Sequence, residues 1–334
     1  MKVLVVDDEI LSVELLREAL TITGYQVDVR ENGSDALAYL RDHGDCRIVI
    51  TDWEMPDMDG IELTRRIRQE TLGHYVYIII VTSRGGTANV VEGLEAGADD
   101  FMSKPFHPSE LEVRLRSGQR LMSLEASNMT IFALAKLAES RDPETGAHLE
   151  RVRGYSRALA AHMATGGPYS DLIDATFIEN IYLTTPLHDI GKVAIPDYVL
   201  LKPGRLTDAE FEIMKMHTTE GAATLNSVLE VAPHASFLRV ARDIALCHHE
   251  RFDGSGYPRG LKGTDIPLSA RIFCLADVYD ALISKRVYKA AFSHDVAKNL
   301  ILEGEGTQFD PHVTGAFVQL EETFRAIVTS QVDP

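Results

Sequence analysis

The chain has 334 residues, of which 45% are hydrophobic and 25% are charged, and its formal net charge is −17. Because this length exceeds what one core usually serves, we expect two domains, and the composition is ordinary for a globular protein. The acidic balance argues against a general nucleic-acid binder, which would carry a basic face. No apolar run is long enough to cross a bilayer, and three scattered cysteines fit reduced thiols. We therefore expect a cytoplasmic protein without membrane insertion.

Short apolar runs alternate with helical patterns in the first third of the chain. Strands that alternate with helices predict an α/β doubly wound fold, here a five-stranded parallel sheet with helices on both faces. The strand-like runs are residues 2–6, 27–29, 47–50, 75–81 and 99–102. Ligands bind such sheets beyond the carboxyl ends of the strands. The reactive or polar side chains that fall at those ends are Asp7, Asp8, Asp52, Thr82 and Lys104.

These strand ends predict a site for phosphoryl transfer. A Mg²⁺ ion relieves the repulsion among the three carboxylates, and Lys104 adds a positive charge. An ionised Asp52 is then a suitable nucleophile, and Thr82 is able to hydrogen-bond a phosphoryl oxygen. The alternative is that each acid only caps a helix, which is common for aspartate at a strand-helix turn. Five such residues at successive strand ends favour the phosphoryl-transfer interpretation.

The stretch TDWEMPDMDG at 51–60, the acidic pair before it, Thr82 and the Lys104-Pro105 pair resemble bacterial response-regulator receiver domains. The resemblance covers residues 1–122 and implies that a sensor histidine kinase phosphorylates Asp52. It also implies that Thr82 and Lys104 form the switch. The Mg²⁺ ligands that it implies are Asp7, Asp8, Asp52 and the backbone carbonyl of Glu54.

Residues 108–137 have a helical pattern with only Gly118 as an interruption, and we expect them to form a connecting helical segment. Two interpretations stay open at this stage. A continuous helix would transmit rotation or dimerisation better than a flexible linker, in which case a homodimer is expected. Alternatively, the apolar stripe of this segment only packs on its own domain.

Residues 126–334 are mostly helical in pattern and carry eight side chains with metal-ligand spacing. They are Glu144, His148, His188, Asp189, His217, His248, His249 and Asp277. A zinc site uses about four ligands, so eight suggest two or three ions, and such a site suits hydrolysis of a phosphate ester. On a helix, the side chains of adjacent residues diverge by about 100°. The pairs His188–Asp189 and His248–His249 would therefore reach two different ions more easily than a single ion. Glu144 could instead cap a helix or pair with Arg141 or Arg151.

Four segments of this half resemble the HD-GYP phosphodiesterases, a branch of the HD hydrolase superfamily. They are RDPETGAH at 141–148, HDIGKVAIPD at 188–197, HHERFDGSGYP at 248–258 and ADVYDALISKRVYK at 276–289. The resemblance covers residues 126–320 and implies an all-α domain that hydrolyses the bacterial messenger cyclic di-GMP to pGpG or onward to GMP. Iron or manganese is the metal that the resemblance implies.

The resemblance also implies roles by position. All eight ligand-type residues match metal ligands, and Asp189 would bridge two ions. Asp189 and Lys192 match catalytic residues, with Lys192 at the scissile phosphate or the leaving group. The substrate-binding residues that it implies are Gly256, Tyr257, Pro258, Asp280, Arg286 and Lys289.

The complete hypothesis is a response regulator whose phosphodiesterase is controlled through Asp52. A different class of function is a binding module with little turnover, in which residues 253–258 dock a partner such as a diguanylate cyclase domain. A third possibility keeps the hydrolase but replaces the substrate with another cyclic dinucleotide.

Overall fold

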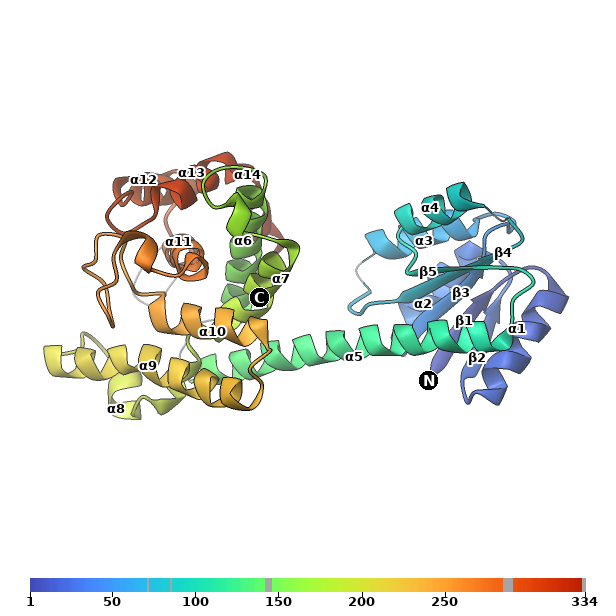
Figure 1. Ribbon diagram of the computed structural model, residues 1–334, viewed down its shortest axis with the longest axis horizontal. Helices are drawn as coiled ribbons and strands as arrows, with labels where there is room; N and C mark the ends of the chain where they lie inside the picture. Colours follow the sequence, from blue (N-terminus) through green and yellow to red (C-terminus); the bar gives the residue numbers. More distant parts are fainter. Residues whose placement is uncertain (71, 85, 142–145, 285–290, 332–334) are drawn as a thin grey trace. The chain divides into compact units, whose positions relative to one another are not determined.

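The computed structural model describes residues 1–70, 72–84, 86–141, 146–284 and 291–331. These residues fall into two compact units, Met1–Ser127 and Asn128–Pro334. Each unit has its own core, and their elements are labelled in Figure 1. Among the described residues, no helix combines the length and the apolar character that a membrane crossing requires.

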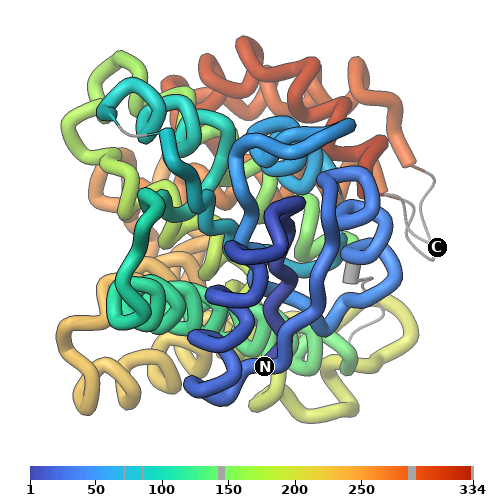
Figure 2. Tube along the Cα trace, turned by 90° about the vertical axis from the view of Figure 1, so that its right-hand side faces the viewer, coloured from blue at the N-terminus to red at the C-terminus, as the bar shows by residue number. Residues whose placement is uncertain are grey.

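The first unit is built on a five-stranded sheet in the order β2-β1-β3-β4-β5, in which every neighbouring pair is parallel (Figure 1). Its strands are β1 Lys2–Val6, β2 Gln26–Arg30, β3 Cys46–Asp52, β4 Tyr77–Thr82 and β5 Asp100–Ser103. The alternation of strand and helix can be followed along the blue to cyan tube in Figure 2. The predicted doubly wound parallel sheet is confirmed.

Helices cover both faces of this sheet. They are α1 Ile10–Ile22, α2 Gly33–Asp42, α3 Gly60–Gln69, α4 Thr87–Glu95 and the first part of α5 Pro108–Glu139. Because successive strand residues point to opposite faces, Val3 and Val5 pack with α1 and α5, whereas Leu4 and Val6 pack with α2 and α3. The helical pattern of residues 11–20 is only half buried, since Leu11 is 72% exposed.

Helix α5 runs without a break from Pro108 to Glu139, and the division between the units falls within it. Leu111, Leu115 and Met122 belong to a core cluster of the first unit, whereas Ala135 belongs to one of the second. The glycine in this helix has a packing reason, because a Cβ at position 118 would lie 2.5 Å from the Tyr77 ring. The predicted connecting segment is therefore helical throughout, and each end of it packs in a core.

The second unit is an assembly of helices, as predicted (Figure 1). Its α-helices are α6 Gly146–Ala164, α7 Ala175–Thr184, α8 Asp197–Leu200, α9 Asp208–Val231, α10 Ser236–Cys247, α11 Leu268–Ile283, α12 His294–Glu303, α13 Pro311–Gln319 and α14 Glu321–Ser330. Short 3-10 helices are η1 Ser170–Leu172, η2 Thr185–Leu187, η3 Ile190–Ala194 and η4 Gly263–Asp265.

An aromatic cluster fixes α6 against α11 and α14 in the core of this unit. The Tyr155 ring stacks on Phe324 at 4.5 Å between centroids and meets Tyr279 edge-on at 5.3 Å. All three side chains are at most 1% exposed. Aromatic pairs in these geometries add to the burial of their large apolar area, so this cluster holds α6 and α11 in a fixed relation.

Candidate functional site

The predicted ligands of the second unit come mostly from the ends of helices. His148 lies in the first turn of α6, His217 in α9 and Asp277 in α11. His188 is the C-cap of η2, and Asp189 is the N-cap of η3. The adjacent pair at 188–189 therefore lies between two short 3-10 helices and not on one helix as the spacing argument assumed. The chain changes direction between them, which also separates the two side chains.

Four histidine rings are anchored through Nδ1, so that Nε2 is the nitrogen left for a metal. The Nδ1 of His188 donates to the Thr185 carbonyl at 3.0 Å, and that of His217 donates to the Met214 carbonyl at 2.6 Å. His248 donates in the same way to carbonyl oxygens of α10, the nearer of which is 3.0 Å away. A carbonyl oxygen only accepts hydrogen bonds, so these contacts fix the tautomer in the manner typical of metal-binding histidines.

The fourth ring, His148, is oriented by a carboxylate. Its Nδ1 lies 2.9 Å from an oxygen of Asp280, which is itself 1% exposed and also accepts from Arg151 Nε at 2.7 Å. These contacts favour a role for Asp280 in holding His148 and Arg151, and its predicted substrate contact stays a prediction. The Nε2 of His148 faces Asp277, at 3.7 Å from Oδ1.

Asp189 lies between the histidines, as a bridging ligand would. Its Oδ1 is 3.3 Å from His217 Nε2 and 3.7 Å from His248 Nε2, and its Oδ2 is 3.1 Å from His188 Nε2. Lys192, one turn further along η3, places Nζ 2.8 Å from the same Oδ2. The carboxylate thus presents one oxygen to the His217 and His248 side and the other to His188.

Two groups of ligand atoms result, and within each group the atoms lie within 4.8 Å of one another. The first is His217, His248 and His249, and the second is Glu139, His148 and His188. We call them the trihistidine group and the Glu139 group. Nitrogen and carboxylate donors in two groups with a bridging aspartate fit two divalent ions of the first transition series.

The ionisation of His217, His249 and Asp189 suits metal binding, whereas at His188 the effect of burial is outweighed by the charge of Asp189, which raises the pKa of that imidazole to about 10. Burial lowers the pKa of His217 to about 4, and burial together with the neighbouring His248 holds the pKa of His249 well below its usual value. Neutral imidazole is the form that binds a metal. Although burial alone would raise the pKa of Asp189, the neighbouring His188 and Lys192 hold it well below its ordinary range. Asp189 is therefore ionised, which is the form of a carboxylate that a metal would bind.

The glycine-rich loop closes over the trihistidine group. The Tyr257 ring lies 4.7 Å from the His249 ring, and the Tyr257 backbone N–H donates to the His249 carbonyl at 3.2 Å. Gly256 is required here, because a Cβ would lie 2.3 Å from the Arg251 nitrogen. Glu250, 2% exposed, accepts backbone hydrogen bonds from Arg259 at 2.8 Å and from residue 261 at 3.0 Å. The loop is thus held in place by a buried carboxylate that the sequence reasoning missed.

Three predicted site residues lie outside the described residues, namely Glu144, Arg286 and Lys289. Glu139 was not predicted at all, although the sequence carries one signal for it. Positions 135, 138 and 139 follow helical spacing, and their residues, Ala135, Ala138 and Glu139, are 1%, 6% and 3% exposed. A carboxylate on the buried stripe of a helix needs compensation, and that requirement points to a charged or metal site.

In the first unit the predicted strand-end residues come together. Asp7, Asp8 and Asp52 offer oxygens within 4.8 Å of one another. The Nζ of Lys104 lies 2.7 Å from Asp7 Oδ2 and 3.3 Å from Asp52 Oδ2. Burial and the charge of Asp7 raise the pKa of Asp52, while Lys104 opposes that rise. Clustered oxygen donors of this kind suit Mg²⁺.

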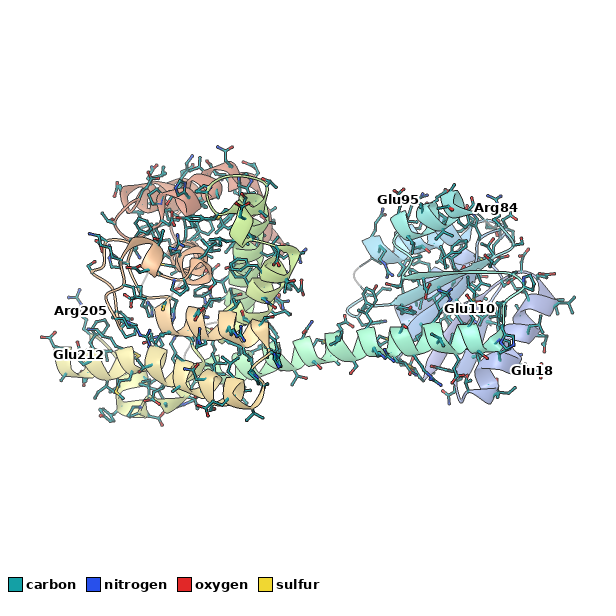
Figure 3. The ribbon with its side chains drawn as sticks, in the orientation of Figure 1. Glu18, Arg84, Glu95, Glu110, Arg205 and Glu212 are labelled. Atoms are coloured by element: carbon teal, nitrogen blue, oxygen red, sulfur yellow. The ribbon has the colours of Figure 1, made fainter. Side chains whose placement is uncertain are left out.

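The remaining predicted residues of this site are Thr82 and Glu54. Thr82 ends β4 and is 1% exposed, and its Oγ1 accepts from the Arg84 backbone N–H at 3.1 Å. Arg84, labelled in Figure 3, also forms an ion pair with Glu54 across the loop ends. Two cations therefore lie at these strand ends: Lys104, which pairs with Asp7 and Asp52, and Arg84, which pairs with Glu54.

Comparison with known proteins also divides the chain into two domains. A family model described as response regulator receiver domain matches residues 3–116, and one described as HD domain matches residues 133–313. A Vibrio cholerae protein named "Probable cyclic di-GMP phosphodiesterase" is 39% identical over 99% of this chain and 80% of its own length.

Two further relatives bear on specificity. The Xanthomonas campestris protein named "Cyclic di-GMP phosphodiesterase response regulator RpfG" is 35% identical over 100% of this chain and 92% of its own length. The Vibrio cholerae protein named "3'3'-cGAMP-specific phosphodiesterase 2" is 38% identical over 63% of this chain and 38% of its own length.

Proposed function

The chain belongs to the HD domain family of metal-dependent hydrolases, here with an N-terminal response regulator receiver domain, and on that premise we propose that its substrate is cyclic di-GMP. Full-length similarity to proteins named for this activity supports the proposal. The observation that carries it is the position of Asp189 between the trihistidine group and the Glu139 group, with Lys192 at 2.8 Å. The domains proposed are residues 1–122 for the receiver and 126–334 for the phosphodiesterase, joined by the helical segment 108–137.

Divalent ions bound at this site supply Lewis acidity toward the phosphodiester and lower the pKa of a bound water. The chain itself holds the geometry: Asp189 is ionised, and Lys192 offers a positive charge for the scissile phosphate or the leaving group. We propose that Gly256, Tyr257 and Pro258 form one wall of the substrate-binding site, where the Tyr257 ring packs against the His249 ring. Arg286 and Lys289 remain proposed phosphate contacts. The products we propose are pGpG or, after a second hydrolysis, GMP.

Iron or manganese is the metal we propose, because histidine and carboxylate donors suit both. In the receiver we propose Mg²⁺ on Asp7, Asp8, Asp52 and the carbonyl of Glu54. A sensor histidine kinase would phosphorylate Asp52, and Thr82 and Lys104 would respond to the phosphoryl group. A cytoplasmic location, a homodimer and docking of diguanylate cyclase proteins complete the proposal.

A turnover assay on purified, metal-reloaded protein tests the proposed active site. The double variant His188→Ala with Asp189→Ala removes ligands from both groups, and hydrolysis of cyclic di-GMP should fall to background. The matched control is His234→Ala, which changes an exposed histidine outside the site. Turnover by the double variant at the wild-type rate would eliminate this site. Metal bound without any turnover by the wild type would favour a binding module instead.

The second candidate substrate is 3'3'-cGAMP, because one relative of the second unit is named as specific for it. Competition between the two cyclic dinucleotides in one reaction compares their kcat/KM values directly. We expect cyclic di-GMP to be consumed first. Preferential loss of 3'3'-cGAMP would reassign the substrate while leaving the metal site intact.

A further inference from the structure

Glu139 is a carboxylate in a place that no motif predicts. It is the last residue of α5 and is 3% exposed. An ionised carboxylate at that depth is costly unless charge or hydrogen bonds compensate it. Among its neighbours are the side chains of His148 and His188, whose ligand atoms lie within 4.8 Å of the carboxylate and of each other.

The tautomers show which nitrogens face Glu139. His188 uses Nδ1 for the Thr185 carbonyl, and His148 uses Nδ1 for Asp280. The Nε2 of His188 lies toward Glu139, and the Nε2 of His148 lies 3.7 Å from Asp277 Oδ1. The distance from Glu139 Oε1 to His188 Nε2 is 4.0 Å, which is too long for a hydrogen bond.

The 4.0 Å between Glu139 Oε1 and His188 Nε2 suits two ligands of one metal ion. Donors that each lie about 2.1 Å from a metal are separated by roughly 3 to 4 Å, depending on the angle between the two bonds. The other close oxygen, Asp189 Oδ2, lies 3.1 Å from the same His188 nitrogen. An ion placed within the Glu139 group would have two imidazole nitrogens and the Glu139 oxygen around it, with Asp189 beside His188.

We propose that Glu139 is a ligand of the ion held by His148 and His188, with Asp189 as the bridge to the trihistidine group. The inference rests on the metal-dependent hydrolase function proposed above, but not on the identity of the substrate. The two ions then differ in kind. The trihistidine group offers neutral nitrogens, whereas the Glu139 group adds a negative oxygen that favours harder ions such as Mn²⁺.

Equilibrium dialysis of the full chain against Mn²⁺ alone tests the assignment. The protein is stripped of metal, reloaded with graded Mn²⁺, and its bound metal is counted by mass spectrometry. The variant Glu139→Gln keeps the size of the side chain and removes its charge. We expect one Mn²⁺ per chain to bind at least tenfold more weakly, while the remaining Mn²⁺ is unchanged.

Glu110→Gln is the matched control, because it makes the same chemical change in the first turn of the same helix on an exposed residue (Figure 3). It should bind Mn²⁺ as the wild type does. Unchanged Mn²⁺ stoichiometry and affinity in Glu139→Gln would overturn the proposal. Mn²⁺ binding is measured without turnover. A wrong substrate would therefore show in the hydrolysis assay alone, whereas a wrong ligand assignment would show in the Mn²⁺ binding.

Thermal melting separates a ligand from a residue that only packs. If Glu139 is a ligand, the increase in Tm that Mn²⁺ causes should be smaller in Glu139→Gln than in the wild type. If Glu139 is only structural, the substitution should shift the Tm of the metal-free protein and leave the Mn²⁺-dependent increase unchanged. An unchanged Mn²⁺-dependent increase in Tm would refute the proposal, and this test requires only that Glu139→Gln folds.

Discussion

Replacing Gly191 by alanine should damage the metal centre through the backbone alone. Gly191 is buried in η3, two residues after Asp189, and faces α9. A Cβ at this position would lie 1.9 Å from the His217 carbonyl oxygen and 2.5 Å from the Gly221 nitrogen. Both clashing atoms belong to the backbone, so no side-chain rotation relieves the overlap.

The size of the displacement follows from these distances. Carbon atoms in contact prefer a separation of about 3.5 Å or more, so η3 and α9 must move apart by roughly 1.5 Å. That movement separates Asp189 from His217, whose ligand atoms are 3.3 Å apart. Metal sites tolerate ligand-distance errors of only about 0.2 Å. Overpacking itself costs about 1–3 kcal/mol.

We therefore expect Gly191→Ala to lose at least about a hundredfold in kcat/KM, because a 1 Å misplacement alone can cost that much. The assays are hydrolysis of cyclic di-GMP, bound metal per chain and thermal melting. Gly315→Ala is the control, since a Cβ there has nothing within 4 Å in α13, and it should stabilise the helix by up to about 1 kcal/mol. Wild-type metal content and turnover in Gly191→Ala would refute the argument.

Three other substitutions and one removal test the remaining parts of the site. Chelation of the metal should abolish turnover and lower the Tm, and Mn²⁺ at a hundred times its Kd should restore about 2.7 kcal/mol of stability; a Tm indifferent to chelator would contradict this. Glu250→Ala should raise the KM severalfold with a smaller change in kcat, because the loop loses two backbone hydrogen bonds. Asp280→Asn should lower stability by about 3–5 kcal/mol, since it removes the negative charge from the buried ion pair with Arg151, and should weaken metal binding 10–100-fold through His148; melting and dialysis measure both effects, and normal values in either would speak against the orienting role. Asp52→Asn should leave basal turnover intact but remove any response to beryllofluoride, and a retained response would place the acceptor elsewhere.

The site at the strand ends was predictable because its residues directly follow strands that can be recognised in the sequence. A parallel sheet brings the carboxyl ends of β1, β3, β4 and β5 to one edge, so residues that follow those strands must meet there. Asp7, Asp52 and Lys104 are within hydrogen-bond or ion-pair distance as this rule requires. The pairs of candidate ligands in the second unit were predicted for a similar reason, because their residue types and spacing are read directly from the chain.

The roles of Glu139, Glu250 and Asp280 were not predictable in the same way. Glu139 and Asp280 lie beside histidines that are far away in the sequence, His188 and His148, and Glu250 acts on the backbone of a loop rather than on a motif. The apolar pattern of α1 predicts a helix but not its burial. Leu16 is buried and Leu11 is exposed, because the pattern does not say how much of a helix another element covers.

The location of the predicted ligands at helix ends explains how the adjacent residues His188 and Asp189 direct their side chains differently. His188 has helical backbone angles as the C-cap of η2, whereas Asp189 has φ −102° and ψ 14° as the N-cap of η3. This turn lets the Asp189 carboxylate reach past His188 toward His217. Because the turn depends on the close approach of Gly191 to α9, the bridge is sensitive to small shifts of a short 3-10 helix. Substitutions at that contact should therefore reduce metal affinity before they reduce the stability of the core.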